Sequence, residues 1–598
     1  MTSPITALSK KFLFLSLLAF AVLCPLGLSQ QSPEGRPLVL QGATVIDGRG
    51  GPPVSGGVIL IAGDRIQSVG ARGTNVPAEA TVVDLSGKFI IPGLIESHAH
   101  YGEWMGEVFL NHGVTSIMAV GGRFGEKKEA SQQSAARTPR IFDTAGDPRL
   151  SPSLTQAQVR DAVQQWLQGK PDFARLRSFF DDRGRQVYQW AAEEIHLAGL
   201  MVFGHTENAP ESIRAGQDSV EHIWGFAQAQ MSPQELDEFQ RGQHLHWAPF
   251  FRDWTRLDQM IREAVDRGAY INPTFLYEMG SLSALAARHE QEDYLLYSNP
   301  RLMAYYPKHV AESLLQKHRQ IRSFSGKYEN LVLISRLTSE ELEEFQQGYR
   351  FAGEFLKRFV QAGGKLQAGT DTLSGGTPGL SLHQEMELFV EAGLTPMQAL
   401  QSATLWSAEM LSGKDGVLGA PQVGVIAEGA FADLVVLAAN PLEDIGNTKN
   451  IERVMKGGAF IELGYDPAYY TFTQPARSIA MATPVPGISA ITPHTVAEGT
   501  PEFEILVEGV GFVGNSVVRV NGVSVPTTFV GPRRLKARVP ADTVERARPN
   551  PFDAPGPAQN VGVFGDRTVP ITVYTAPPEG GLSNRILLRV QAKWMGPE

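Results

Sequence analysis

Cysteine is almost absent from this chain: Cys24 is the only one among 598 residues. It lies inside an apolar run near the N-terminus, so a chain cut after that run would contain no cysteine. Disulfide bonds are therefore excluded as a support for the mature fold.

Long apolar runs are equally scarce, and the run over residues 12–26 is the one that stands out. It is shorter than the roughly 20 apolar residues that a membrane-spanning helix needs. Lys10 and Lys11 precede it, and small residues follow it up to Ser29. This pattern predicts a secretory signal peptide over residues 1–29, hence export to the periplasm or out of the cell, with no membrane span after cleavage. A membrane anchor and a lipidated Cys24 are the alternatives.

Positive charge is also in short supply, because 53 Lys and Arg residues face 63 Asp and Glu residues, for a net charge of −10. An acidic surface argues against nucleic acids and anionic membranes as partners. The chain is 42% hydrophobic and 19% charged, which is typical of a globular protein. Its length is too great for a single core, so two or three domains are expected.

What the chain does contain is a long alternation of short apolar strands with amphipathic helical stretches, over about residues 92–412. This order is typical of an α/β protein built on a (β/α)8 TIM barrel. The inner strands are expected to end at or near His98, Val120, Thr144, Leu176, His205, His222, Thr274 and Asp371. A stretch over about 278–350, rich in Glu, Gln, Arg and Leu, is longer than one barrel helix and predicts a helical insertion over the mouth.

The composition of the sequence changes after the predicted barrel and its flanking strands, and residues 466–483 are predicted to be a linker. Short alternating strands with Gly and Asn turns follow over 484–592, which predicts a separate β-sandwich.

The pair His98 and His100 closes the apolar run over residues 88–97. Side chains two apart on a strand share one face, so both imidazoles would point to the same place. At the mouth of a barrel they would offer two nitrogen ligands to a divalent metal. His205 and His222 each end a further β-rich run.

Several motifs in a fixed order resemble the amidohydrolase superfamily, in its imidazolonepropionase-like and Xaa-Pro dipeptidase-like branch. They are the segments FIIPGLIESHAH, LMVFGHTEN, DSVEHIWG, KLQAGTDT and GAFADLVVLAANPLEDI. The resemblance covers about residues 37–465 and implies a barrel with its site at the carboxyl ends of the strands. It also implies a composite β-sandwich assembled from residues 37–91 and 413–465.

The resemblance further implies the members of the site. His98, His100, His205, His222 and Asp371 correspond to metal ligands. Asp371 matches the family's strand-eight aspartate, which takes a proton from the attacking water and returns it to the leaving amine. His222, or the metal, would polarise the scissile carbonyl.

Arg175 departs from the family pattern, since relatives usually carry a carboxylated lysine there that bridges two metals. A guanidinium stays protonated and does not become such a ligand. This favours one metal per chain, with Zn2+ as the first choice for a nitrogen-rich site. Arg175 and Tyr101 are predicted substrate contacts.

These observations predict an exported metal-dependent hydrolase of a carbon–nitrogen bond in a small-molecule or peptide-like substrate. An Xaa-Pro-type dipeptidase is the narrower alternative, and an inactive barrel serving as a binding or scaffold protein is the alternative that Arg175 motivates. The phrases ITPHTVAEG and VVRVNGVSVPTTFV resemble an immunoglobulin-like IPT/TIG domain, which would serve protein or glycan contact, spacing or assembly. Self-association stays open.

Overall fold

Parallel strands form the centre of the larger part of the molecule. The computed structural model describes residues 36–177, 181–241, 244, 246–297, 302, 305–307, 338–372, 377–464, 486–545, 567–575, 583 and 586–591. The predicted signal peptide, the linker over 466–483 and much of the predicted insertion over 278–350 lie outside these residues.

Within the described residues, eight parallel strands fall into two sheets. The first sheet consists of β7 (Leu94–Ala99), β8 (Val114–Ala119) and β9 (Arg140–Asp143). The second consists of β10 (Ala174–Arg175), β11 (Val202–His205), β12 (Ser219–Glu221), β13 (Tyr270–Asn272) and β14 (Lys365–Leu366).

The two sheets meet at both edges, which gives a barrel-like arrangement. On one side Ala99 forms a parallel bridge with Thr372, and the amide of Ser97 donates to the carbonyl of Ala368 at 3.1 Å. On the other side the amide of Asp172 donates to the carbonyl of Asp143 at 2.9 Å. The carboxyl ends of all eight strands therefore lie at one end of this unit.

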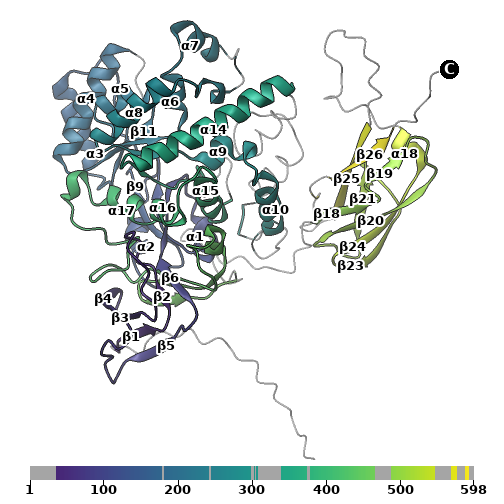
Figure 1. Ribbon diagram of the computed structural model, residues 1–598, viewed down its shortest axis with the longest axis horizontal. Helices are drawn as coiled ribbons and strands as arrows, with labels where there is room; N and C mark the ends of the chain where they lie inside the picture. The colour runs from purple at the N-terminus through teal and green to yellow at the C-terminus, as the bar shows by residue number, and fades with distance from the viewer. Residues whose placement is uncertain are drawn as a thin grey trace, which may run out of the picture.

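Helices alternate with these strands and pack around them (Figure 1). In chain order they include α1 (Gly106–Asn111), α2 (Glu126–Ser131), α3 (Gln156–Leu167), α4 (Asp182–Leu197), α5 (Ala209–Arg214), α6 (Trp224–Gln228), α7 (Pro233–Gln240), α8 (Trp254–Asp266), α9 (Phe275–Met279), α10 (Ala286–Tyr297), α14 (Ser339–Gln361), α15 (Leu380–Glu391), α16 (Pro396–Ser402) and α17 (Leu405–Leu411). Many begin at a side-chain cap. Thr155, for example, caps α3 and forms a capping box with Gln158.

Strands from before and after the barrel-like unit form two further sheets. One holds β1 (Leu38–Gln41), β3 (Val58–Ala62), β4 (Arg65–Gly70) and β5 (Thr81–Asp84). The other holds β2 (Thr44–Val45), β6 (Phe89–Pro92), β15 (Leu434–Leu437), β16 (Ile451–Lys456) and β17 (Ala459–Ile461). Leu40 and Ile59 of the first pack in one core with Ile90 and Val436 of the second, so residues more than 300 positions apart share a core.

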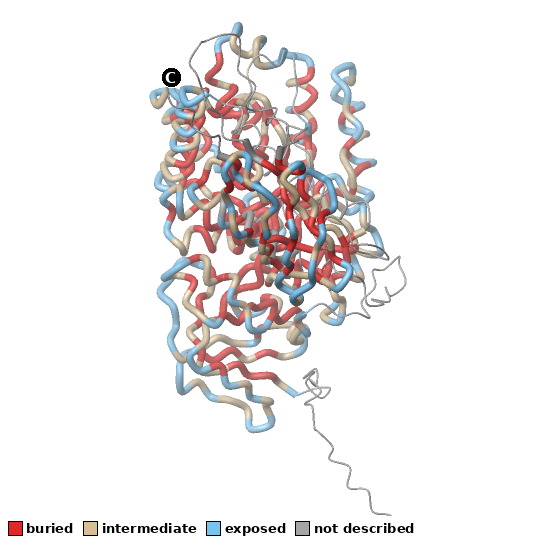
Figure 2. Tube along the Cα trace, turned by 90° about the vertical axis from the view of Figure 1, so that its right-hand side faces the viewer, coloured by how far each residue is buried: buried red, intermediate tan, exposed pale blue. Residues whose placement is uncertain are grey.

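The C-terminal strands build a separate two-sheet sandwich. One sheet has the order β18 (Gly487–Thr492), β20 (Phe503–Val510), β24 (Arg534–Val539) and β23 (Thr527–Gly531). The other has the order β19 (Thr495–Ala497), β26 (Ile586–Gln591), β25 (Arg567–Thr575), β21 (Ser516–Val520) and β22 (Val523–Ser524), and α18 (Ala541–Glu545) follows β24. Exposed and buried residues alternate along β24, as expected of a strand with one solvated face. Figure 2 shows buried residues concentrated toward the interior of the molecule and exposed residues along its outer turns.

The first seven parallel strands end within two residues of the positions expected from the sequence, and β14 ends at Leu366, five residues before Asp371. Within the described part of the chain, no helix is long and apolar enough to cross a membrane.

Candidate metal centre

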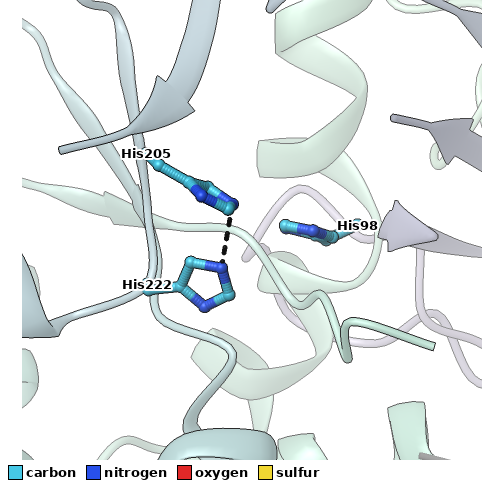
Figure 3. Close-up of side chains that lie close together, drawn as sticks. All are labelled: His98, His205 and His222. Carbon is cyan, nitrogen blue, oxygen red and sulfur yellow. Dashed lines mark hydrogen bonds between the residues drawn. The ribbon is translucent and has the colours of Figure 1, made fainter. Parts of the chain in front are cut away.

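The predicted ligands lie at the carboxyl ends of four of the parallel strands. His98 is on β7 and His100 follows it directly, His205 is the last residue of β11, and His222 follows β12. Asp371 comes five residues after the end of β14. Figure 3 shows His98, His205 and His222 pointing toward one another, and they come from the ends of three different strands.

His98 is the centre of the group and is fully buried. Both of its ring nitrogens lack a hydrogen-bond partner. The nearest anionic atoms are Glu221 Oε1, 3.4 Å from Nδ1, and Asp371 Oδ1, 3.6 Å from Nε2. Burial lowers the pKa of His98 to about 3, so the ring is neutral at physiological pH and keeps a free lone pair. A buried imidazole with two unsatisfied nitrogens fits a ligand position better than a structural one.

Two groups of potential ligand atoms share His98. One is completed by His100 and Asp371, and the other by His205 and His222. His100 Nε2 lies 3.1 Å from Asp371 Oδ1, and His205 Nε2 lies 3.1 Å from His222 Nε2. Two ligands about 2.1 Å from one tetrahedral ion are about 3.4 Å apart, so both separations fit a divalent metal such as Zn2+.

Asp371 is a buried carboxylate held in its charged form. Burial alone would raise its pKa, but His100, with its Nε2 3.1 Å from Oδ1, and the nearby imidazoles of His98 and His222 lower the pKa below its usual range. Its backbone has a φ of +49°, in the left-handed region that a residue with a Cβ rarely adopts. Its Oδ1 lies 3.1 Å from His100 Nε2 and 3.6 Å from His98 Nε2, so the carboxylate faces these two histidines.

His222 has the same left-handed backbone, with a φ of +63°. Its Nδ1 lies 2.6 Å from Thr274 Oγ1 and 3.0 Å from Glu278 Oε1. Burial by itself would lower the pKa of His222. The hydrogen bond to Glu278 and the negative charge of that carboxylate outweigh burial and raise the pKa above its ordinary value. The Nε2 atom is left facing His205.

Glu221 is the site residue that the sequence analysis missed. Its side chain is fully buried, and its Oε2 lies 3.0 Å from His205 Nε2 and 3.2 Å from Arg175 Nε. Burial would raise the pKa of this carboxyl, but the nearby imidazoles of His98 and His205 and the guanidinium of Arg175 hold it well below the usual range. One feature of the sequence could have identified Glu221 as a site residue: it directly precedes His222 at the end of a predicted strand.

Arg175 lies on β10 beside the histidines, as its place in the sequence predicts. Its Nη2 is 2.9 Å from His205 Nε2, and its Nε bonds Glu221, so the guanidinium is engaged on two sides. Tyr101 bonds Thr138 through its hydroxyl at 2.6 Å, and its ring packs against Phe109 and Phe124.

A third cluster of His289, Glu292 and Glu387 also has the spacing of a metal site. Here the carboxylates already face a cation, because Lys449 Nζ lies 2.6 Å from Glu292 and 2.8 Å from Glu387. This cluster is an ion-pair network that links α10 and α15 to the segment before β16.

One segment of this chain is similar to a known protein family. Residues 354–461 match the amidohydrolase family model. This segment contains Asp371 and strands β14 to β17, whereas the four histidines precede it. Ochratoxinase from Aspergillus niger is 37% identical over 102 residues, which are 17% of this chain and 20% of that protein. The match thus spans about a fifth of the length of these curated relatives.

Solved structures similar to this chain cover most of it. A Xaa-Pro dipeptidase with methionine bound in its active site has a TM-score of 0.48 at 18% identity and covers 71% of this chain and all of that one. The A. niger ochratoxinase structure has a TM-score of 0.48 at 17% identity and covers 75% of this chain and 100% of that one. Phenylurea hydrolase B has a TM-score of 0.49 at 17% identity and covers 73% of this chain and 99% of that one.

Proposed function

We propose that this protein is an exported metal-dependent hydrolase that cleaves a carbon–nitrogen bond in an amide, a cyclic amide or a peptide-like substrate. The observation that carries the proposal is His98, a buried neutral imidazole with two unpartnered nitrogens, between two groups of further ligands. The match of residues 354–461 to the amidohydrolase family supports the reaction class.

One Zn2+ per chain is the proposed cofactor, held by ligands drawn from His98, His100, His205, His222 and Asp371. When bound, a divalent cation lowers the pKa of water toward about 7 and polarises the substrate carbonyl. The ionised carboxylate of Asp371 takes the proton from the attacking water. It then gives that proton to the leaving nitrogen, as a general base that becomes a general acid.

Arg175 and Glu221 form the part of the site that departs from a two-metal design. Their ion pair places a permanent positive charge 2.9 Å from His205 Nε2. A guanidinium at this place disfavours a second divalent cation by charge repulsion, since it does not lose its proton. The guanidinium also lies at one edge of the site, where it is a proposed contact for a substrate oxygen. Tyr101, which follows His100, remains a proposed substrate contact.

The metal content of the purified chain is the test of this proposal. We expect one equivalent of metal in the wild type by elemental analysis, and nearly two in an Arg175→Lys variant. A panel of N-acyl amino acids, cyclic amides and dipeptides, including Xaa-Pro dipeptides, then identifies the leaving group. Absence of metal from both proteins would contradict the proposal.

A second candidate is a barrel without turnover that serves as an exported binding protein. It is favoured by the contact between Arg175 Nη2 and His205 Nε2, because the guanidinium competes with a metal for that nitrogen. Bound metal without hydrolysis of any amide in the panel would support this candidate.

Export and the role of the C-terminal sandwich belong to the same proposal. We infer cleavage after about residue 29, which mass spectrometry of protein recovered from the periplasm or the medium tests directly. The sandwich over residues 486–591 is proposed to be an IPT/TIG-like module for contact with a protein or a glycan, and binding of the chain to a glycan array examines one of these two partners.

A further inference from the structure

The Nδ1 atom of His222 faces two hydrogen-bond acceptors at the end of β13. Thr274 Oγ1 lies at 2.6 Å, and Glu278 Oε1 lies at 3.0 Å. The Thr274 hydroxyl donates its own hydrogen to the carbonyl of Pro273 at 2.8 Å, so it meets His222 with a lone pair. Both neighbours therefore accept, and the proton of the neutral imidazole belongs on Nδ1.

The carboxylate of Glu278 is fixed in position by burial and by hydrogen bonds, as expected of an acceptor for His222 Nδ1. It is 8% exposed and lies on the short helix α9, where its amide donates to the carbonyl of Thr274 at 3.0 Å. Its second oxygen, Oε2, accepts a hydrogen bond from Trp247 Nε1 at 3.1 Å. The carboxylate is thus fixed at both oxygens, one toward Trp247 and one toward His222.

The helix that carries Glu278 is itself anchored. Glu385 of α15 accepts hydrogen bonds from the amides of Phe275 and Leu276, at 2.7 and 2.5 Å. These are the first amides of α9, which have no partner inside the helix. The position of Glu278 relative to His222 is therefore set by α15 as well as by β13.

We propose that Glu278 is a positioning residue that fixes the tautomer and the orientation of His222, so that Nε2 presents its lone pair to the metal. His222 Nε2 lies 3.1 Å from His205 Nε2, within the ligand group shared with His98. A carboxylate behind a ligand histidine restricts rotation of the ring and makes the opposite nitrogen more basic. The inference rests on the proposed metal site and is independent of which bond the protein hydrolyses.

The test is the affinity of the full chain for Co2+ and Zn2+, measured by chelator competition on wild type and Glu278→Gln. Glutamine keeps the size of the side chain and removes its charge. We expect the affinity of the variant to fall by about 10- to 100-fold. The visible spectrum of bound Co2+ should also change in the variant, because the imidazole is less constrained.

Asp218→Asn is the matched control. Asp218 precedes β12, at the end opposite His222, and accepts a hydrogen bond from His196 Nε2 at 2.7 Å. It is also a buried carboxylate paired with a histidine, so a general loss of stability would affect both variants. The control is expected to bind Co2+ with wild-type affinity and a wild-type spectrum.

Trp247→Phe provides a second, milder test that leaves the charge of Glu278 in place. It removes the hydrogen bond to Oε2, and we expect a loss of affinity of about 2- to 10-fold. Wild-type affinity and spectrum in Glu278→Gln would overturn the positioning role while leaving the metal site intact. A wild-type chain that binds neither Co2+ nor Zn2+ would overturn the proposed function together with this inference.

Discussion

At the scale of single residues, the site depends on side chains whose burial conflicts with their polarity. His98 gives up both hydrogen bonds on folding, while Asp371 and Glu221 stay charged only because imidazoles and a guanidinium surround them. Such groups raise the cost of folding, and their concentration at the carboxyl ends of the strands supports the proposal that this region is a functional site.

Asp371→Asn is predicted to abolish turnover with little effect on folding. The amide cannot accept the proton of the attacking water, so kcat should fall by at least about 10²- to 10⁴-fold. Steady-state kinetics on a substrate found in the panel, with circular dichroism as a check of the fold, measures this. Retention of more than half of the wild-type kcat would contradict the proton-transfer role.

Glu385 makes the stability of the protein depend on pH. Burial raises its pKa from 4.5 to about 8, so between these values the folded chain holds a proton that the unfolded chain releases. The free energy of unfolding therefore falls as the pH rises through this window, by at most about 1.4 kcal/mol per pH unit from this group.

Urea unfolding at pH 5.5 and pH 7.5 tests the sign of this effect. Glu385→Gln cannot titrate, so the difference between the two pH values should be smaller in the variant than in the wild type. An equal difference in both proteins would show that Glu385 is ionised throughout the range.

At the scale of secondary-structure elements, the parallel strands and the flanking sheet are joined by a buried ion pair. Arg140, the first residue of β9, bonds Asp433 through Nε at 2.6 Å and Nη2 at 3.1 Å, and both side chains are almost fully buried. Asp433 directly precedes β15, and it also accepts the amide of Gly457 at 2.7 Å. The pair thus links residues 293 positions apart.

Asp433→Asn is predicted to lower the free energy of unfolding by about 3–5 kcal/mol, because it leaves the Arg140 charge buried without its partner. Asp258→Asn is the control: its partner Arg358 lies at 3.1 Å, but both side chains are well exposed, and the expected cost is below about 1 kcal/mol. Urea unfolding of both variants measures the contrast. Similar losses in the two would show that the Arg140 pair contributes no more than a surface pair.

At the scale of the whole molecule, the C-terminal sandwich has a hydrophobic core of its own. That core consists of residues between Ile488 and Val590, drawn from the inner faces of both sheets. The barrel-like unit has a separate large core, to which strands, helices α14 and α15 and the segment after β15 contribute. Separate cores allow separate unfolding transitions.

Calorimetry of the full chain is therefore expected to show two transitions, of which only one shifts upward when Zn2+ is added. Leu535→Ala, in the core of the C-terminal sandwich, should lower the transition that does not respond to the metal, at a cost of about 2–5 kcal/mol. A single transition that moves as a whole with metal and with this substitution would indicate one cooperative unit.

The sequence predicted a mixed α/β protein and most of the strand ends, because apolar runs and turn residues are local signals. It also located the five candidate ligands, since each closes or follows such a run. Glu278 could not be predicted as a site residue from the sequence. It lies where the sequence indicated the start of a helical insertion, and its contact with His222 depends on the turn that follows β13. Glu221 was visible as a neighbour of His222, but along a regular strand the two side chains would point to opposite faces.

The sequence by itself determined which residue types end the strands and in what order, because strand period, turn chemistry and apolar runs depend on neighbours a few positions away. Only the tertiary structure decided which carboxylate meets which histidine. The contacts of His98 with Glu221 and Asp371 join residues more than 100 positions apart, so they depend on how the strands are placed side by side. His222 and Asp371 also have a left-handed backbone, which their residue types adopt more readily than most but which the surrounding structure has to hold in place.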